Sequence, residues 1–360
     1  MKTILITGSA GFIGSNLVER LLTTESPVKI VGLDSVNDYY DVRLKEYRLS
    51  RLEQLAKEHP ESTYTFVKGN IADKALIAHL FAEYEFDVVV NLAAQAGVRY
   101  SITNPDAYIE SNLIGFYNIL EACRHSYDGG KKGVEHLVYA SSSSVYGSNK
   151  KVPYSTDDKV DNPVSLYAAT KKSNELMAHA YSKLYNIPST GLRFFTVYGP
   201  AGRPDMAYFG FTKKLVKGET IQIFNYGNCK RDFTYVDDIV EGVVRIMQHA
   251  PEKKTGEDGL PIPPYKVYNI GNNSPENLLD FVQILQEELI AAGVLPEDYD
   301  FEAHKELVPM QPGDVPVTYA DTSALEQDLG FKPTTSLRVG LHNFAKWYKE
   351  FYKEKGCSLE

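Results

Sequence analysis

The stretch TILITGSAGFIG, residues 3–14, predicts how this chain begins to fold. It joins a short β-branched apolar run to a helical pattern through Gly8, Gly11 and Gly14. Glycines at such a junction permit a tight turn and let the backbone lie close to a pyrophosphate, whose charge is favoured at a helix N-terminus. A glycine pattern alone is weak evidence, but a strand before it and a helix after it are the context of a dinucleotide-binding turn.

The rest of the first half repeats this alternation of strand and helix. Apolar runs that predict strands lie at 28–33, 64–67, 87–92, 136–140 and 189–195. Helical patterns lie at 12–23, 41–58, 73–84, 105–126 and 165–186. Buried strands separated by helices predict an α/β fold with a doubly wound parallel sheet of the Rossmann type.

The second half has shorter elements and predicts a smaller, mixed α/β lobe. Helices are expected at 207–217, 236–249, 277–292 and 338–353, and strands at 220–224 and 266–269. The Pro/Gly-rich segment 251–265 is interpreted as a solvated insertion. We therefore expect a dinucleotide-binding domain over 1–195, to which a segment near 232–249 returns, and a substrate-binding domain over most of 196–360.

Composition excludes several classes of function. The chain has 360 residues, 43% of them hydrophobic, and a net charge of -9, which argues against a binder of nucleic acid or of a membrane surface. Three cysteines without a pairing pattern suit a reducing compartment, and the histidines show no metal-ligand spacing. No run approaches the ~20 apolar residues of a membrane span. We expect a cytoplasmic protein without a metal.

Asp34 favours NAD over NADP as the dinucleotide. It ends the second predicted strand, where a carboxylate accepts hydrogen bonds from an adenosine ribose and repels a 2′-phosphate. The other expected cofactor contacts are Phe12 and Ile13 in the turn, Asn70 and Ile71 near adenine, and a wall of small residues formed by Ala93, Ala94 and Gln95.

Tyr167 and Lys171 form the candidate acid–base pair. They lie four residues apart on a predicted helix and therefore share one face. A free phenol titrates near pH 10, but a neighbouring ammonium favours the phenolate and lowers the pKa of the tyrosine. This spacing alone is common in structural helices, so its meaning depends on the cofactor turn upstream.

The chain resembles the extended short-chain dehydrogenase/reductase family through TGSAGFIG, SSSSVYG, YAATK and RDFTYVDDI. Within it, the chain is most similar to nucleotide-sugar epimerases of the UDP-glucuronate 4-epimerase group, through NLAAQAGVRYS, SLYAATKKSNE, RFFTVYGPAGRPDMA and QPGDVPVTYAD. The resemblance implies NAD that stays bound and is regenerated at each turnover, and a UDP-sugar substrate. It also implies a homodimer formed through the helices near 105–126 and 165–186.

The resemblance also assigns a role to the serine run. Ser142, with Tyr167 and Lys171, is the expected catalytic set, and its hydroxyl would bind the sugar 4-oxygen. Relatives that dehydrate the sugar resemble TDEVYG here, and decarboxylating relatives resemble TSEVYG. This chain has Ser143 and Ser144 instead of those acids, and we count both among the substrate-binding residues. The sequence thus favours oxidation and re-reduction at C4 without loss of water or CO2.

The remaining substrate residues follow from the same resemblance. Thr196 and Arg203 lie where relatives bind a uronic-acid carboxylate, and Arg231 looks like a diphosphate clamp. Many relatives have Arg where this chain has Gln311, so Gln311 and Asp314 are expected to bind diphosphate or ribose by hydrogen bonds. The expected reaction is epimerisation of UDP-glucuronate to UDP-galacturonate through a transient 4-keto sugar.

Three alternatives stay open at this point. The substrate could be another UDP sugar, such as galactose, glucose or a pentose, with Arg203 only a solvated loop residue. A UDP-glucuronate decarboxylase is disfavoured because Ser144 replaces the required Glu. A non-catalytic NAD-dependent scaffold or sensor is disfavoured by the intact Ser142, Tyr167 and Lys171.

Overall fold

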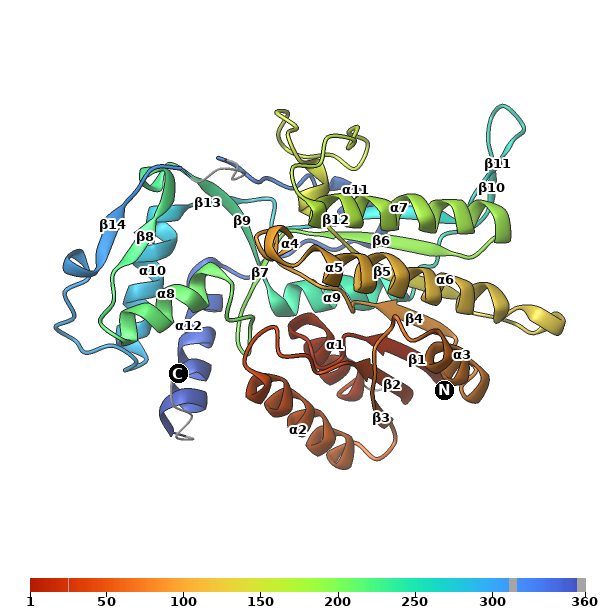
Figure 1. The fold of residues 1–360 in the computed structure, drawn as a ribbon, viewed down its shortest axis with the longest axis horizontal. Helices are drawn as coiled ribbons and strands as arrows, with labels where there is room; N and C mark the ends of the chain where they lie inside the picture. The colour runs from red at the N-terminus through yellow and green to blue at the C-terminus, as the bar shows by residue number, and fades with distance from the viewer. Residues whose placement is uncertain (25, 311–315, 355–360) are drawn as a thin grey trace. The chain divides into compact units, whose positions relative to one another are not determined.

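The computed structural model describes residues 1–24, 26–310 and 316–354 (Figure 1). The chain divides into two compact units. Unit 1 is built from Met1–Lys150, Thr156–Phe194 and Val240–Asn269. Unit 2 contains Lys151–Ser155, Phe195–Ile239 and the described part of Ile270–Glu360. The assignment of cofactor to the first part of the chain and of substrate to the second stays a prediction.

A seven-stranded sheet forms the centre of unit 1, with the order β12-β6-β5-β4-β1-β2-β3. Its strands are β1 (Lys2–Thr7), β2 (Val28–Asp34), β3 (Thr63–Lys68), β4 (Val88–Asn91), β5 (His136–Ser142), β6 (Ser189–Phe194) and β12 (Tyr265–Ile270). The pairings among β1 to β6 are all parallel. This order is that of a doubly wound dinucleotide-binding sheet, so the predicted fold class is confirmed.

One strand of this sheet corrects the expectation from sequence. We placed the strand near 266–269 in the C-terminal lobe, whereas β12 is an edge strand beside β6. The N–H of Ser189 donates to the carbonyl of Pro264 (2.9 Å), and that of Phe195 to Ile270 (3.1 Å). The residue numbers rise together, so β12 runs parallel to β6. Pairing between strands distant in sequence is a tertiary property that local composition does not encode.

Helices follow the strands of unit 1 nearly where the periodicity predicts them. They are α1 (Phe12–Leu22), α2 (Val42–Glu58), α3 (Lys74–Glu83), α4 (Tyr100–Thr103), α5 (Pro105–Tyr108), α6 (Phe116–His125), α7 (Leu166–Tyr185) and the later part of α9 (Val236–Met247). Side-chain caps define several of their starts. Asp73 accepts from the N–H groups of Ala75 and Leu76 before α3, and Ser165 accepts from Ala168 in α7.

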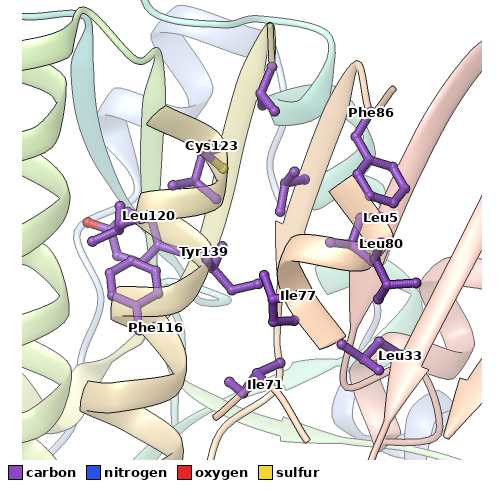
Figure 2. Packing of buried hydrophobic residues seen from close by; sticks show 14 of the residues in the cluster. Leu5, Leu33, Ile71, Ile77, Leu80, Phe86, Phe116, Leu120, Cys123 and Tyr139 are labelled. Carbon is purple, nitrogen blue, oxygen red and sulfur yellow. The ribbon is translucent and has the colours of Figure 1, made fainter. Parts of the chain in front are cut away.

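Helices α3, α6 and α7 cover one face of the large sheet with a continuous apolar core. Figure 2 shows Phe116, Leu120 and Cys123 of α6 packed toward Tyr139 of β5. Ile77 and Leu80 of α3 join Leu5, Leu33 and Phe86 in the same cluster. Alternation along β1 turns Ile4 to the opposite face, where it lines a hollow with Leu21 of α1 and Met247 of α9. The sheet is therefore covered on both faces, as a parallel sheet requires.

Unit 2 contains small mixed sheets and helices, as expected for the second half of the chain. In one sheet β9 (Lys230–Tyr235) runs parallel to β7 (Thr196–Tyr198) and antiparallel to β13 (Pro275–Asn277). In another, β8 (Ile221–Ile223) pairs with β14 (Lys305–Leu307). The helices of this unit are α8 (Ala207–Val216), α10 (Leu278–Ala291), α11 (Ser323–Leu329) and α12 (Leu337–Tyr348). Phe233 and Phe281 stack at 4.3 Å between ring centroids in its core.

Two surface features complete the description. Within the expected insertion 251–265, β10 (Lys254–Thr255) and β11 (Pro261–Ile262) form an exposed antiparallel hairpin. Across the described residues, no helix combines the length and apolar character needed to span a membrane.

Candidate active site

The glycine turn after β1 has the shape that the sequence predicts. Gly8 has a φ of +73°, and a Cβ there would lie 2.8 Å from the backbone nitrogen of Ala93. A Cβ on Gly14 would lie 2.1 Å from the carbonyl oxygen of Gly8. Gly11 caps α1 without a side-chain hydrogen bond, so the first N–H groups of the helix receive no side-chain partner there. This cradle fits the pyrophosphate of a dinucleotide.

Asp34 lies at the end of β2, beside the same turn. Its Oδ2 accepts from the N–H of Ala10 (3.1 Å), and its Oδ1 accepts from the N–H of Val36 (2.8 Å). The carboxylate is thereby oriented by backbone on both sides. Acceptor capacity remains for ribose hydroxyls, because each ionised oxygen accepts about two hydrogen bonds. The geometry fits the expected contact with adenosine.

A cation that sequence reasoning missed lies close to Asp34. Lys45 of α2 is buried, and its Nζ donates to the carbonyl and side-chain oxygens of Asn37 at 2.7 and 2.6 Å. Burial lowers the pKa of Lys45, while the charge of Asp34 raises it. Lys45 therefore holds the loop that follows β2. A lysine on the buried face of an amphipathic helix was the available signal.

The expected adenine-side residues differ in what their side chains do. Asn70 donates to Glu110 (3.0 Å), and its Oδ1 accepts from the N–H of Ala72 (2.9 Å). The side chain of Ile71 is buried in the apolar core, so only its backbone is available for a ligand. Both residues lie in the turn between β3 and α3, where the Asn70 side chain bonds its own loop while the Ile71 side chain joins the core. Both roles stay predictions.

The small residues after β4 are held by a π-helical turn. Ala93 donates its N–H to Thr7 Oγ1 (3.1 Å), and Ala94 follows it, half-buried. The backbone of Gln95 is hydrogen-bonded on both sides by Asn112: Asn112 Oδ1 accepts from its N–H (2.8 Å), and Asn112 Nδ2 donates to its carbonyl (3.1 Å). Asn112 also donates to Thr170 Oγ1 (3.0 Å), three residues after Tyr167.

Asn112 is a site residue that the sequence did not reveal. It lies in η1 (Ile109–Gly115), a π-helical segment that interrupts the single helix expected at 105–126. Such segments often occur at functional sites, because the widened turn redirects side chains. A buried asparagine in the middle of an apolar helix was the only signal. It ties the loop after β4, which is expected to contact the cofactor, to helix α7, which carries Tyr167.

The structure brings Ser142 and Lys171 to the same strand end. Ser142 is the last residue of β5, and Lys171 Nζ donates to the carbonyl of Ala140 on that strand (3.0 Å). Lys171 is 4% exposed, and burial lowers its pKa to about 8. Tyr167 lies one turn earlier in α7, with its ring edge-on to the buried Tyr108 at 6.0 Å. Their joint catalytic role stays a prediction.

The serine run forms a compact turn. Ser142 Oγ accepts from the N–H of Ser144 (3.2 Å) and so caps the short helix η3 (Ser143–Tyr146). Ser143 and Ser144 are half-buried within it. The run is therefore an ordered end of β5, with hydroxyls at both positions where we noted acids in other relatives.

The expected substrate residues Thr196, Arg203 and Arg231 belong to unit 2. Thr196 begins β7 and pairs with Phe233, two residues after Arg231 on β9. Arg231 Nη1 donates to the carbonyls of Lys230 (3.1 Å) and Pro316 (3.2 Å). The structure thus places Thr196 and Arg231 on neighbouring strands. Gln311 and Asp314 lie outside the described residues.

Arg203 has a partner of its own. Its Nε and Nη2 donate to the two carboxylate oxygens of Asp205 at 3.1 and 2.5 Å. Such a fork is the geometry with which an arginine binds any carboxylate. Arg203 is therefore arranged to hold a carboxylate, and the one that it holds in this structure belongs to the chain itself.

Comparison with known proteins identifies the family of this chain. The model of the NAD dependent epimerase/dehydratase family matches residues 4–271. Protein CapI of Staphylococcus aureus is 51% identical over 357 residues, which cover 98% of this chain and 99% of CapI. UDP-glucuronate 4-epimerase 4 of Arabidopsis thaliana is 46% identical over 97% of this chain and 76% of its own length.

A solved structure shows the same fold. The crystal structure of UDP-glucuronic acid 4-epimerase from Bacillus cereus, in complex with UDP-glucuronic acid and NAD, has a TM-score of 0.80 and 32% sequence identity. The match covers 97% of this chain and 100% of that one. Because the glycine cradle, the sheet order and these matches agree, the protein belongs to the NAD-dependent epimerase/dehydratase family, and its cofactor is NAD.

Proposed function

We propose that this protein interconverts UDP-glucuronate and UDP-galacturonate by epimerisation at C4. The observation that carries the proposal is the turn Ser142–Ser143–Ser144 at the end of β5, which presents hydroxyls and no carboxylic acid. Hydroxyls do not serve as acid or base for elimination near neutral pH. The similarity to proteins named UDP-glucuronate 4-epimerase supports the choice of sugar.

In this proposal the residues of unit 1 remove one proton from the sugar and later return it. Tyr167 as phenolate takes the proton of the sugar 4-hydroxyl and later returns it on the other face of the ring. Lys171 keeps the phenolate accessible, because at neutral pH its ammonium is still mostly protonated with a pKa of about 8. Ser142 donates a hydrogen bond to the 4-oxygen as it becomes a ketone oxygen. Bound NAD supplies the site that accepts and returns the C4 hydride.

The orientation of the uronic carboxylate must also be fixed. Oxidation at C4 makes a β-keto acid, which loses CO2 when the carboxylate bond aligns with the ketone. Arg203 would hold the carboxylate as it holds Asp205 in this structure, through a two-pronged fork, with Thr196 donating a further hydrogen bond. For this, substrate has to displace Asp205 or share the guanidinium with it.

The Arg203–Asp205 pair also favours the second candidate function. An arginine already neutralised by its own chain has little attraction left for a uronate, and a neutral UDP sugar would then be the substrate. The two proposals differ in what Arg203→Ala does. It should abolish conversion of UDP-glucuronate or release pentose and CO2, but should leave conversion of a neutral sugar intact.

The deciding experiment is incubation of the purified protein with UDP-glucuronate and no added NAD, followed by NMR of the products. UDP-galacturonate without pentose is the expected result, because net redox is zero and NAD stays bound. Stoichiometric UDP-pentose and CO2 would establish a decarboxylase instead. Tyr167→Phe is the matched inactive control, since it removes only the hydroxyl.

We also propose that the protein is a homodimer through its helical face. Helix α7 and the preceding segment η1–α6 carry apolar side chains that water reaches: Ile109, Ile114, Tyr117, Leu176, Leu184 and Tyr185. Leu184 is 67% exposed and Leu176 59%. Apolar side chains gathered on two helices of one face are typical of a subunit interface.

A further inference from the structure

A buried ion pair lies directly behind the serine turn. Arg193 of β6 donates from Nε and Nη2 to the two carboxylate oxygens of Glu175 in α7, at 2.8 and 2.9 Å. Both side chains are 3% exposed. Apolar residues of similar volume would often give equal or greater stability, because burying two charges costs several kcal/mol. Stability alone is therefore a weak explanation for this pair.

Glu175 holds the residue that precedes Ser142. Ser141 Oγ donates to Glu175 Oε1 at 2.7 Å. In the sheet Ser141 is paired with Arg193, so all three groups meet at one level. Side chains alternate between the two faces of a sheet along a strand. Fixing the Ser141 side chain on the face covered by α7 therefore also fixes the direction in which the side chain of Ser142 projects.

Arg193 holds the far end of the same turn. Its Nη1 donates to the hydroxyl of Tyr146 (3.0 Å), and that hydroxyl donates to Asn269 Oδ1 (2.7 Å). The guanidinium also lies 4.9 Å from the centre of the Tyr146 ring. Tyr146 is the last residue of η3, the turn that Ser142 caps. One ion pair therefore holds the segment containing Ser142 at both ends.

The pair also sets the register of α7 against β5. Tyr167, Lys171 and Glu175 follow one another at intervals of four and lie on one face of α7. Lys171 bonds the carbonyl of Ala140, and Glu175 bonds the side chain of the next residue, Ser141. Two successive residues of the strand are thus tied to two successive turns of the helix.

We propose that Glu175 and Arg193 are positioning residues that fix the Ser142 hydroxyl relative to Tyr167 and Lys171. They act through Ser141 and Tyr146. The inference rests on the proposed function only in taking Ser142 and Tyr167 as the reacting groups, and it is independent of which sugar is bound. Reacting groups displaced by about 1 Å lose on the order of 100-fold in rate, so small movements of this turn matter.

The pair stays ionised under working conditions. Burial by itself raises the pKa of Glu175, but hydrogen bonds and charge from Arg193 outweigh it and bring the pKa below its ordinary value. Lys172 Nζ adds a further contact to Oε2 at 3.1 Å. The anchors of Ser141 and Tyr146 are therefore charge-assisted hydrogen bonds, which are stronger and more directional than neutral ones.

The first test removes the anchors and leaves the ion pair in place. Ser141→Ala with Tyr146→Phe deletes two hydroxyls without adding volume. We expect kcat to fall by at least about tenfold with KM within about threefold, because geometry changes and sugar binding does not. Ser182→Ala is the matched control: Ser182 lies in α7, seven residues beyond Glu175, is fully buried and donates to the carbonyl of Pro264 (2.9 Å). It should lower the melting temperature similarly and leave kcat unchanged.

The second test separates positioning from stability. Arg193→Met alone removes the two-pronged partner of the buried Glu175, leaves only the Lys172 ammonium as its counter-charge, and should destabilise the protein. Glu175→Leu combined with Arg193→Met removes both charges and should recover the melting temperature. If positioning is the role, kcat of this double variant stays at least about tenfold below wild type, because Ser141 and Tyr146 remain unanchored. Recovery of kcat together with stability would overturn the proposal, as would an unchanged kcat after loss of both anchors.

The assay substrate is chosen so that failure of the proposed sugar specificity can be told apart from failure of the positioning role of Glu175 and Arg193. Wild type is first offered the UDP derivatives of glucuronate, glucose, N-acetylglucosamine and xylose, and every variant is assayed with the one converted fastest. A preferred sugar other than glucuronate overturns the proposed substrate but leaves the positioning test valid. NAD content per subunit is measured for each variant, so that loss of cofactor is not mistaken for loss of geometry.

Discussion

Replacing Lys171 by methionine should stabilise the NAD-free protein near neutral pH, although it removes a group that the proposed reaction needs. Lys171 is 4% exposed, and burial lowers its pKa from 10.5 to about 8. Each pKa unit corresponds to 1.36 kcal/mol, so the change of 2.5 (10.5 − 8) is a cost of about 3 kcal/mol for keeping the ammonium buried. Losing the hydrogen bond to Ala140 offsets about 1 kcal/mol, which leaves a gain of about 2 kcal/mol.

The gain should depend on pH with a definite sign. Below pH 8 Lys171 is protonated in both the folded and the unfolded chain. The free energy of unfolding of wild type is therefore reduced by the full cost of burying the ammonium. Between about pH 8 and 10.5 the folded chain releases the proton and the unfolded chain keeps it, so the stability of wild type rises with pH. From pH 7 to 9.5 the advantage of Lys171→Met should therefore shrink by about 2 kcal/mol.

The assay is urea denaturation of both proteins at several pH values, followed by far-UV circular dichroism. Tryptophan fluorescence is unsuitable, because the single tryptophan, Trp347, belongs to unit 2 while Lys171 belongs to unit 1. Equal m-values are required before midpoints are converted to free energies. A stability difference that stays constant within about 0.5 kcal/mol from pH 7 to 9.5 would refute a buried ammonium with a lowered pKa.

Three further predictions concern the turn, a buried histidine and the interface. Gly14→Ala puts a methyl group 2.1 Å from the Gly8 carbonyl oxygen, so the turn must open. Its NAD affinity, measured by calorimetry, should fall at least about tenfold, and an unchanged affinity would contradict the cradle. Burial lowers the pKa of His136 to about 4, so the stability of wild type should fall by about 3 kcal/mol as pH drops from 6.5 to 4, and His136→Gln should remove that share of the loss. Leu184→Glu should convert the proposed dimer to monomer in sedimentation, whereas Val339→Glu at an exposed position of α12 should not; equal effects would exclude α7 as the interface.

Much of unit 1 could be predicted because its signals are local. Every apolar run read as a strand in the first half forms one, and the glycine turn has the expected conformation at Gly8. Most of these runs are buried β-branched or apolar segments separated by helices with clear periodicity, so local composition identifies them. The strand β12 was misplaced because its neighbour in the sheet, β6, lies some seventy residues earlier in the chain.

The groups that we propose to orient the candidate reacting residues were harder to foresee. Arg193 interrupts the apolar run STGLRFF, and Glu175 lies on the buried face of α7; each was a visible signal of a buried charge. Neither residue identifies its partner, because an ion pair between a helix and a strand depends on how they pack. Asn112 was hidden for a similar reason, since a π-helical turn changes the direction of its side chain without a mark in the hydrophobic pattern.

The sequence by itself determined the fold class, the position of the cofactor turn and the set of candidate reacting residues. Each of these depends on residue types at short spacings, as with Tyr167 and Lys171 one helical turn apart. Only the tertiary structure decided that Lys171 is buried against Ala140, that Arg203 already holds Asp205, and that one ion pair anchors both ends of the serine turn. Burial and partner choice arise when distant segments exclude water from one another, and that happens only in the folded chain.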